Sequence, residues 1–327
     1  MLSRILYRAQ DCLFPAFANR YWRQKVSEQV RSLVYHRVGR IGEFPFIDAF
    51  GAPVIDALSL ARDIRFLQNQ GARFLTFADL REGRFPGAGE FGVIVSFDDG
   101  TRDVYERGLP LLESLGVRGV VFQVSSFIGA RKLIWEHQLY LLWSNSDYRS
   151  KLRSAMLRLV DGNALPTGDF AALNMLREWP DVSALKQVMC EVLMGEPGVD
   201  QGILAEALYP SAAHVRDAAK AGHEIGSHGQ NHLMRTALDQ ASFELELACS
   251  KAELETITGS PVLAFSHPFN RYEVDDRLCL ERNFDQVATV GGGAIVRDSD
   301  AMALSRINWP GEFRNDFRWR RWLWTGG

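Results

Sequence analysis

Two adjacent carboxylates, Asp98 and Asp99, directly follow a run of apolar residues. The run, FGVIVSF over 91–97, predicts a buried strand, so the pair stands at the carboxyl end of a strand. Adjacent carboxylates repel one another unless a cation or separate hydrogen-bond partners hold them. A turn at Gly100 would let both side chains converge on one site in different roles. Because DDG is also a common turn sequence, a purely structural role stays open for the pair taken alone.

Two histidines, His228 and His232, lie four residues apart in the segment GSHGQNH. On a helical turn, residues i and i+4 share one face, so both imidazoles can reach a single divalent ion. Adding Asp99 gives two imidazoles and one carboxylate, a ligand set that leaves coordination positions open for water and substrate. Open positions indicate a catalytic metal. A chance pairing among the seven histidines of the chain is the alternative.

A third histidine, His267, follows another apolar run in the segment AFSHPF. Pro268 restricts His267 to an extended backbone, and the turn beyond it can present backbone N–H groups to a pocket. A core or surface position for this histidine is the alternative. On a predicted helix earlier in the chain, the neighbours Trp135, Glu136 and His137 could line a substrate groove, with simple packing as the alternative.

In this order, the three segments resemble the motifs of polysaccharide deacetylases of the NodB-homology group, carbohydrate esterase family 4. SFDDG is similar to the first family motif, TFDDG; SHGQNH is similar to the second, HSxxH; and FSHPFN is similar to a variant of the third, RxPY. The resemblance also takes in LVYHRVG around residue 36 and AGHEIGSH before the histidine pair, and it covers roughly residues 32–310. The ordered set is more specific than any one motif.

The resemblance implies a deformed (β/α) barrel and a hydrolase that removes acetyl groups from N-acetylated, or O-acetylated, sugars of a polysaccharide or a lipid-linked glycan precursor. It implies one divalent metal ion, zinc before cobalt, nickel, iron or manganese, bound by Asp99, His228 and His232. Asp98 would be the general base that takes a proton from the attacking water. The metal and a backbone N–H near Phe269 would hold the oxyanion.

Two departures from the family motifs concern the surroundings of these residues. Gly229 stands where the family has Ser or Thr, so a hydroxyl that braces the loop is missing. Ser266 stands where the RxPY motif has arginine, so the partner that keeps Asp98 ionised must come from elsewhere. Arg306 is the candidate, with an ordinary salt bridge as the alternative. We expect three residues to lie on the substrate and oxyanion side of the site: Arg306, and the Phe269 and Trp135 introduced above.

The third departure concerns the general acid. Many family members supply a late Leu-His motif whose imidazole protonates the leaving amine, but no histidine follows His267 in this chain. An amine leaves poorly without a proton, so an active enzyme needs a substitute acid. We expect His267 in that role, and His36, at the end of the first predicted strand, in second place.

Strand-like runs alternate with helical patterns through most of the chain. Strands are predicted at 32–36, 91–97, 119–124, 224–227 and 262–265, and helices at 57–71, 105–116 and 243–259. This alternation predicts a parallel sheet, open or closed, with its chemistry at the carboxyl ends of the strands. Residues 130–210 interrupt it with two predicted helices, around 133–143 and 170–195, and are interpreted as an insertion over the barrel mouth. We expect one domain, 31–312, between an amphipathic segment at 1–30 and a basic aromatic tail at 313–327.

The 327 residues carry 37 Lys and Arg against 40 Asp and Glu, and a net charge of −3 gives no electrostatic reason to bind nucleic acid. The four cysteines are far apart in the sequence, which favours reduced thiols. We recognise neither a signal peptide nor a membrane span, so a cytoplasmic location is expected. Aromatic and basic residues mixed in both end segments suit a peripheral membrane contact, with helices packed on the domain as the alternative. The alternative functions are a deformylase or other small-amide hydrolase, and a non-catalytic glycan-binding barrel.

Overall fold

The computed structural model describes residues 25–51, 53–156, 165–179, 181–194 and 200–308. Within these residues, seven parallel strands close into a barrel, because β10 pairs back onto β1. In order around the ring they are β1 (Val30–Tyr35), β5 (Gly92–Phe97), β6 (Val120–Gln123), β7 (Glu224–Ser227), β8 (Ala264–Ser266), β9 (Gln286–Val290) and β10 (Leu304–Asn308). The predicted fold class, a deformed (β/α) barrel, is confirmed.

β5 has neighbours on both of its edges. One edge pairs with β1 along the whole strand. The other edge pairs with the short strand β4 (Arg73–Leu75) in its first half and with β6 at Ser96 and Phe97. The strand is therefore fixed up to its last residue, and so is the starting position of the acidic pair that follows it.

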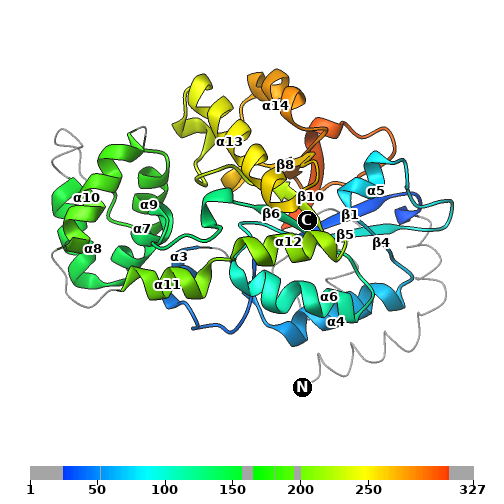
Figure 1. Ribbon diagram of the computed structural model, residues 1–327, viewed down its shortest axis with the longest axis horizontal. Coiled ribbons are helices and arrows are strands. Elements are labelled where there is room, and N and C mark those ends of the chain that lie inside the picture. Colours follow the sequence, from blue (N-terminus) through cyan, green and yellow to red (C-terminus); the bar gives the residue numbers. More distant parts are fainter. Residues whose placement is uncertain (1–24, 52, 157–164, 180, 195–199, 309–327) are drawn as a thin grey trace, which may run out of the picture.

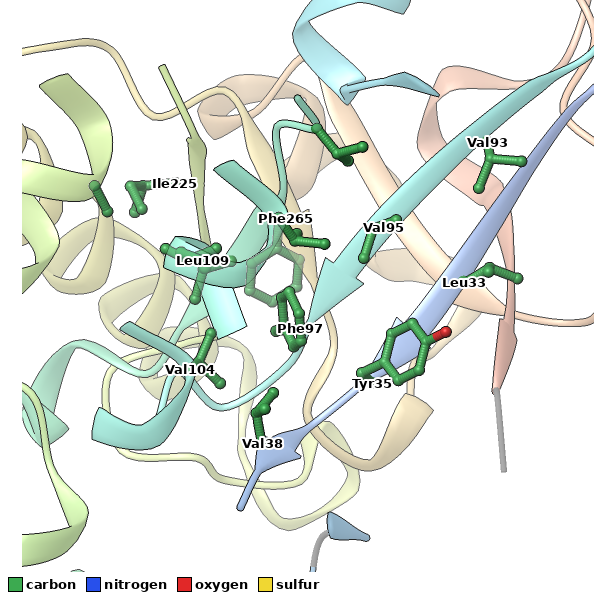
Figure 2. Packing of buried hydrophobic residues seen from close by; sticks show 14 of the residues in the cluster. Leu33, Tyr35, Val38, Val93, Val95, Phe97, Val104, Leu109, Ile225 and Phe265 are labelled. Carbon is green, nitrogen blue, oxygen red and sulfur yellow. The ribbon is translucent and has the colours of Figure 1, made fainter. Parts of the chain in front are cut away.

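The outward-facing side chains of the strands pack against helices and form the main hydrophobic core. Figure 2 shows part of this core from close by, with Tyr35, Val95, Phe97 and Leu109 among the labelled residues. Because the barrel strands are covered by helices outside and filled by side chains inside, their sequences are nearly continuous apolar runs. This burial is why β1, β5 and β6 could be predicted from the sequence.

The inward-facing side chains change character along the barrel axis. Near the amino ends of the strands, apolar side chains that include Ile94, Phe122 and Leu304 fill the interior. Toward the carboxyl ends the interior is polar and buried, with Ser96 from β5 and Arg306 from β10. This polar layer lies directly beneath the strand ends that carry the acidic pair.

Helices surround the barrel in Figure 1. They are α4 (Ala57–Asn69), α5 (Phe77–Arg81), α6 (Leu109–Ser114), α12 (Ala212–Lys220), α13 (Gln240–Thr258) and α14 (Arg277–Asn283). α4 begins where the Asp56 side chain accepts the Ser59 N–H at 2.9 Å. α13 ends at Gly259, whose φ of 69° lies in the left-handed region that glycine adopts without strain.

The helix predicted at 105–116 is present and runs without a break from Arg102 to Ser114. A π-helical turn over Val104–Gly108 precedes α6, which begins at Leu109. Pro110 lies inside this helix and has no N–H to donate, and directly before it the Leu109 N–H bonds the Val104 carbonyl five residues back. The wider π-helical turn accommodates the proline, so the helix continues as the periodicity predicts.

The insertion is helical throughout its described part and has a hydrophobic core of its own. Its helices are α7 (Trp135–Ser144), α8 (Ser146–Met156), α9 (Asp169–Arg177), α10 (Val182–Met194) and α11 (Gln201–Leu208), and its core includes Leu139, Trp143, Leu152, Leu173 and Leu185. Figure 1 shows α7 to α10 gathered on one side of the barrel. Of the two helices predicted here, the first is α7 and the second is divided into α9 and α10, while α8 and α11 were not predicted. Pro180 falls in the sequence between α9 and α10, and a proline interrupts a helix.

A small lobe connects β1 to α4. It contains β2 (Arg37–Val38), β3 (Val54–Ile55), which pairs with β2 in parallel, and α3 (Pro45–Phe50), which packs against α7 of the insertion. Among the helices that the structure describes, none combines the length and apolarity needed to span a bilayer. The aromatic and basic segments expected to contact a membrane fall almost entirely on residues 1–24 and 309–327, outside the described residues.

Candidate active site

The carboxyl ends of β1, β5, β7 and β8 lead into a pocket of about 340 Å³. Both the barrel and the insertion line it. The barrel side contributes His36, Asp98, Asp99, His228, His232 and Phe269, and the insertion contributes Glu136, His137, Tyr140 and Arg177. The pocket therefore lies at the strand ends where the sequence pattern placed the chemistry.

Asp99, His228 and His232 come together as one buried cluster. One donor atom from each side chain lies within 4.8 Å of the other two. The Nε2 atoms of His228 and His232 lie 3.6 and 3.3 Å from the same carboxylate oxygen, Oδ1 of Asp99. Two imidazole nitrogens and a carboxylate oxygen thus face a common point beside the pocket.

The other ring nitrogen of each histidine is held by an oxygen acceptor. His228 Nδ1 donates to the main-chain carbonyl of Ser266 at 2.8 Å, and His232 Nδ1 donates to a carboxylate oxygen of Glu136 at 2.5 Å. Since both Nδ1 atoms carry the proton, both Nε2 atoms can offer a lone pair to a metal. This donor set fits a single divalent cation such as Zn²⁺, with room left for further ligands.

The charges of the cluster also favour a cation. Burial lowers the pKa of His228 to about 4, which leaves this ring neutral at ordinary pH. Burial acts in the same direction on His232, but the carboxylates of Glu136 and Asp99 outweigh it and raise the pKa of His232 to about 10. His232 lies between the carboxylates of Glu136 and Asp99, which together favour a positive charge there. When no metal is bound, a second proton on the His232 ring supplies this charge.

Asp98 lies beside the cluster but has a different partner. Both of its carboxylate oxygens accept hydrogen bonds from the guanidinium of Arg306, at 2.6 and 2.9 Å, and Arg306 is 1% exposed. Burial would raise the pKa of Asp98, but Arg306, followed by His228, holds that pKa below its usual value. Arg306 also hydrogen-bonds the Ser266 hydroxyl, so the arginine from β10 lies against the serine that replaces the motif arginine.

The backbone around the pocket adopts conformations that most residues avoid. Asp99, His232, Phe269 and Asn270 all have positive φ, between 53° and 67°. Gly100 follows at φ 73°, and a Cβ on it would lie 2.0 Å from an oxygen of the Gln123 side chain. Clustering of such conformations at a pocket is typical of functional sites, where surrounding contacts hold the strain.

The loop with the two histidines is braced without the missing hydroxyl. Glu246, a buried residue of α13, accepts the N–H groups of Gln230 and Asn231 at 3.0 and 2.8 Å and the side-chain amide of Asn231 at 2.5 Å. The main-chain carbonyl of Asn231 accepts the indole N–H of Trp135 at 3.1 Å. The loop is thus held on one side by Glu246 of helix α13 and on the other by Trp135 of the insertion.

Trp135 therefore has a place other than the one expected from the sequence. Within the described part of the chain it is buried and is not among the residues that line this pocket. Its neighbours Glu136 and His137 do line the pocket. Phe269 lines it too, with its ring centroid 4.6 Å from that of His232.

His267 also lies away from the pocket lining. Its ring packs against Phe243, Phe265 and Tyr272, and its Nδ1 is buried with no hydrogen-bond partner among the described residues. Burial, with repulsion from His228, lowers the pKa of His267 to about 3, so the ring is neutral at ordinary pH. This placement does not suit a general acid. The second expected residue, His36, does line the pocket.

Tyr140 and Arg177 are among the pocket residues that sequence reasoning missed. Arg177 ends α9 and lies over the rings of both Tyr140 and Phe269, 5.1 and 5.4 Å from their centroids. An arginine at a helix end in an insertion carries no motif, so the sequence held no signal for it. Glu136 was noticed beside Trp135, but its contact with His232 could not be foreseen across 96 residues.

Comparison with known proteins gives a match that covers part of the chain. Residues 181–282, which contain the histidine loop and the third motif, match the family model described as polysaccharide deacetylase. A search of curated proteins by sequence finds no match.

Solved structures match nearly the whole chain at low identity. A polysaccharide deacetylase from Bacillus cereus is 14% identical with a TM-score of 0.57, covering 90% of this chain and 69% of that one. The deacetylase PplD of Streptococcus pyogenes, solved with acetate, is 13% identical with a TM-score of 0.57, covering 90% and 98%. IcaB from Ammonifex degensii is 18% identical with a TM-score of 0.56, covering 92% and 98%. At such identities the likeness establishes a shared fold. The partial family match and the shared barrel together make this chain similar to polysaccharide deacetylases in its fold and in its second and third motifs.

Proposed function

We propose that the protein is a metal-dependent deacetylase that hydrolyses the acetamido group of an N-acetylated sugar in a polysaccharide or a lipid-linked glycan precursor. The observation that carries this proposal is the convergence of Asp99, His228 and His232 within 4.8 Å at a pocket that Asp98 shares. Three ligands leave coordination positions open, which distinguishes a catalytic from a structural metal site. The family match supports the choice of an acetyl group.

In the proposed reaction, Asp99, His228 and His232 hold one divalent ion, with Zn²⁺ as the first candidate. Such an ion, when bound, polarises the scissile carbonyl and makes a water molecule more acidic. Asp98 then takes the proton of the attacking water through its carboxylate. Because Arg306 keeps Asp98 ionised, the base is ready at neutral pH.

The leaving amine needs a proton, and we assign its delivery to His36. His36 follows β1 and lines the pocket together with Asp98 and Asp99. Its Nδ1 is buried and has no hydrogen-bond partner among the described residues, so no hydrogen bond there decides which ring nitrogen carries a proton. The left-handed turn at Phe269 places main-chain groups near the same pocket, where an N–H can stabilise the oxyanion.

The sequence supports a proposal for the substrate class. We propose cytoplasmic action on biosynthetic intermediates, with the aromatic and basic segments at 1–30 and 313–327 serving substrates on a lipid carrier. The test is release of acetate from UDP-linked, lipid-linked and oligomeric N-acetylhexosamines, with formate release from N-formyl analogues measured in parallel. Metal-stripped protein is the control. We expect acetate release that disappears on stripping and returns with Zn²⁺ or Co²⁺.

Two variants separate the roles at the site. His228→Ala removes a ligand and is expected to abolish both metal binding and turnover. Asp98→Asn keeps the ligands and is expected to bind metal while lowering kcat by about 10²- to 10⁴-fold. Full activity of Asp98→Asn would contradict the assignment of the base. Glycan binding without any acyl release, by protein that does bind metal, would favour the non-catalytic barrel.

A further inference from the structure

We propose that Glu136, on the first helix of the insertion, is the positioning residue for His232, so that the insertion completes the metal site of the barrel. The inference rests on the proposed function because it concerns a metal bound by His232. It goes beyond that function by assigning a role to the insertion, which lies outside the three motifs. Glu136 touches a ligand and not the reacting atoms, so its expected effect is on metal binding first.

The contact between the two side chains is short and buried. Oε2 of Glu136 accepts the Nδ1–H of His232 at 2.5 Å, and both residues are buried. The hydrogen bond fixes the ring with Nε2 directed at Asp99, 3.3 Å away. A carboxylate in this position also makes the imidazole a stronger electron donor, and loss of such a partner commonly weakens metal affinity by about 10- to 100-fold.

The second oxygen of Glu136 is anchored within the insertion. The Tyr140 hydroxyl, one turn along α7, donates to Oε1, and Nε of Arg177 lies 3.5 Å from the same oxygen. Arg177 in turn donates to the Tyr140 hydroxyl and to the main-chain carbonyl of Phe50, at 2.8 Å for the latter. Both oxygens of the Glu136 carboxylate thus have partners, Oε1 within the insertion and Oε2 at His232, so the fixed carboxylate orients the His232 ring.

The two histidines are oriented by different parts of the molecule. His228 donates to the carbonyl of Ser266, which belongs to barrel strand β8, whereas His232 donates to the insertion. His232 also has a φ of 53°, a conformation that a residue with a side chain holds only when its surroundings impose it. Glu136 and the Trp135 bond to Asn231 supply that constraint from one turn of α7.

The test is metal affinity. Metal-free parent protein, Glu136→Gln and Gln138→Ala are titrated with Zn²⁺ against a chromophoric chelator, and the visible spectrum of the Co²⁺ forms is recorded. We expect Glu136→Gln to bind Zn²⁺ about 10- to 100-fold more weakly and to show a changed Co²⁺ spectrum. Gln138 lies on the same helix, and in the described part of the chain its side chain bonds within the insertion, to Leu133 and Gln201, so Gln138→Ala controls for destabilisation of α7.

The outcomes separate this inference from the proposed function. If the parent protein binds no Zn²⁺, the proposed function fails. If the parent binds Zn²⁺ and Glu136→Gln binds it within about twofold, only the positioning role is overturned. An equal loss in Gln138→Ala and Glu136→Gln would also overturn it, because the effect would then come from the helix. Should Glu136→Gln not fold, Tyr140→Phe decides: weaker binding supports the role and parental affinity overturns it.

Discussion

Asp98 and Asp99 are neighbours in the chain, but their partners differ. Asp98 meets Arg306 in the barrel interior, whereas Asp99, at φ 67°, turns toward the two imidazoles. One left-handed residue therefore separates two carboxylates that would otherwise repel each other. The arginine that the third motif lacks is supplied by β10, on which Arg306 and the apolar Leu304 lie two residues apart and both face the barrel interior.

Arg306→Lys is predicted to move the acid limb of the activity profile to higher pH. The base works only when deprotonated, and Arg306 is the strongest influence that lowers the pKa of Asp98 against burial. Lysine keeps a positive charge but cannot form the paired hydrogen bonds, which are worth about 1.5–3 kcal/mol. The pKa of Asp98 should rise, so activity should be lost at a pH about one to two units higher. The measurement is kcat/KM against pH.

Arg297→Lys is the matched control for this prediction. Arg297 is exposed and lies over the Phe85 ring on the surface, far from any contact with the acidic pair. Its replacement should leave the profile unchanged. An unmoved acid limb in Arg306→Lys would mean that another group, and not Asp98, sets the pH dependence.

At the scale of elements, burial on both faces made some strands predictable and others not. β1, β5 and β6 are four to six residues long, buried and largely apolar, so their sequences stand out. β4, β9 and β10 escaped notice. β4 has only three residues, and β10 mixes a buried arginine with apolar positions because it faces the polar layer of the barrel. Short or partly polar strands carry no clear period.

The candidate site shows the same division. The proposed ligand set and the proposed base could be predicted from local motifs, because each motif directly follows a strand end. The groups that orient these residues, Glu136 and Arg306, come from separate elements, and their contacts depend on packing across long sequence separations. His267 illustrates the limit: it follows β8 at the expected place, yet its ring lies against Phe243 and Phe265.

Glu246→Ala is predicted to loosen the histidine loop. Glu246 is one buried position on α13 that satisfies three N–H groups of Gln230 and Asn231. Leaving buried donors unpaired costs about 1–3 kcal/mol, and the loop should lose part of its fixed geometry. We expect a lower melting temperature of the metal-free protein and weaker Zn²⁺ binding. Differential scanning fluorimetry and the chelator titration measure the two effects.

Glu244→Ala provides the comparison on the same helix. Glu244 is exposed and accepts a hydrogen bond from Gln240 one turn away, so its loss should change stability by no more than about 0.5 kcal/mol. If the two variants behave alike, the loop does not depend on α13, and its rigidity must come from the Trp135 bond and the strand ends.

At the scale of the whole molecule, the buried histidines make the fold sensitive to acid. Burial lowers the pKa of His137 to about 4 and of His267 to about 3, against an ordinary value of 6.5. The folded state keeps these rings neutral while the unfolded chain takes up protons below pH 6.5. Stability is therefore complete above pH 6.5 and falls as the pH drops toward 3. Between pH 7 and pH 5, protonation of each of these histidines in the unfolded chain lowers the free energy of unfolding by about 2 kcal/mol.

His267→Phe is predicted to remove one of these contributions. Phenylalanine fits among the rings of Phe243, Phe265 and Tyr272 and eliminates a buried nitrogen that has no partner in the described residues. Urea unfolding of chelator-treated protein should show a loss between pH 7 and pH 5 that is smaller by about 2 kcal/mol than in the parent. Because the ring lies away from the pocket lining, kcat should stay within a few-fold of the parent value. A large fall in kcat with an unchanged pH dependence of unfolding would instead return His267 to the role of general acid and displace His36 from it.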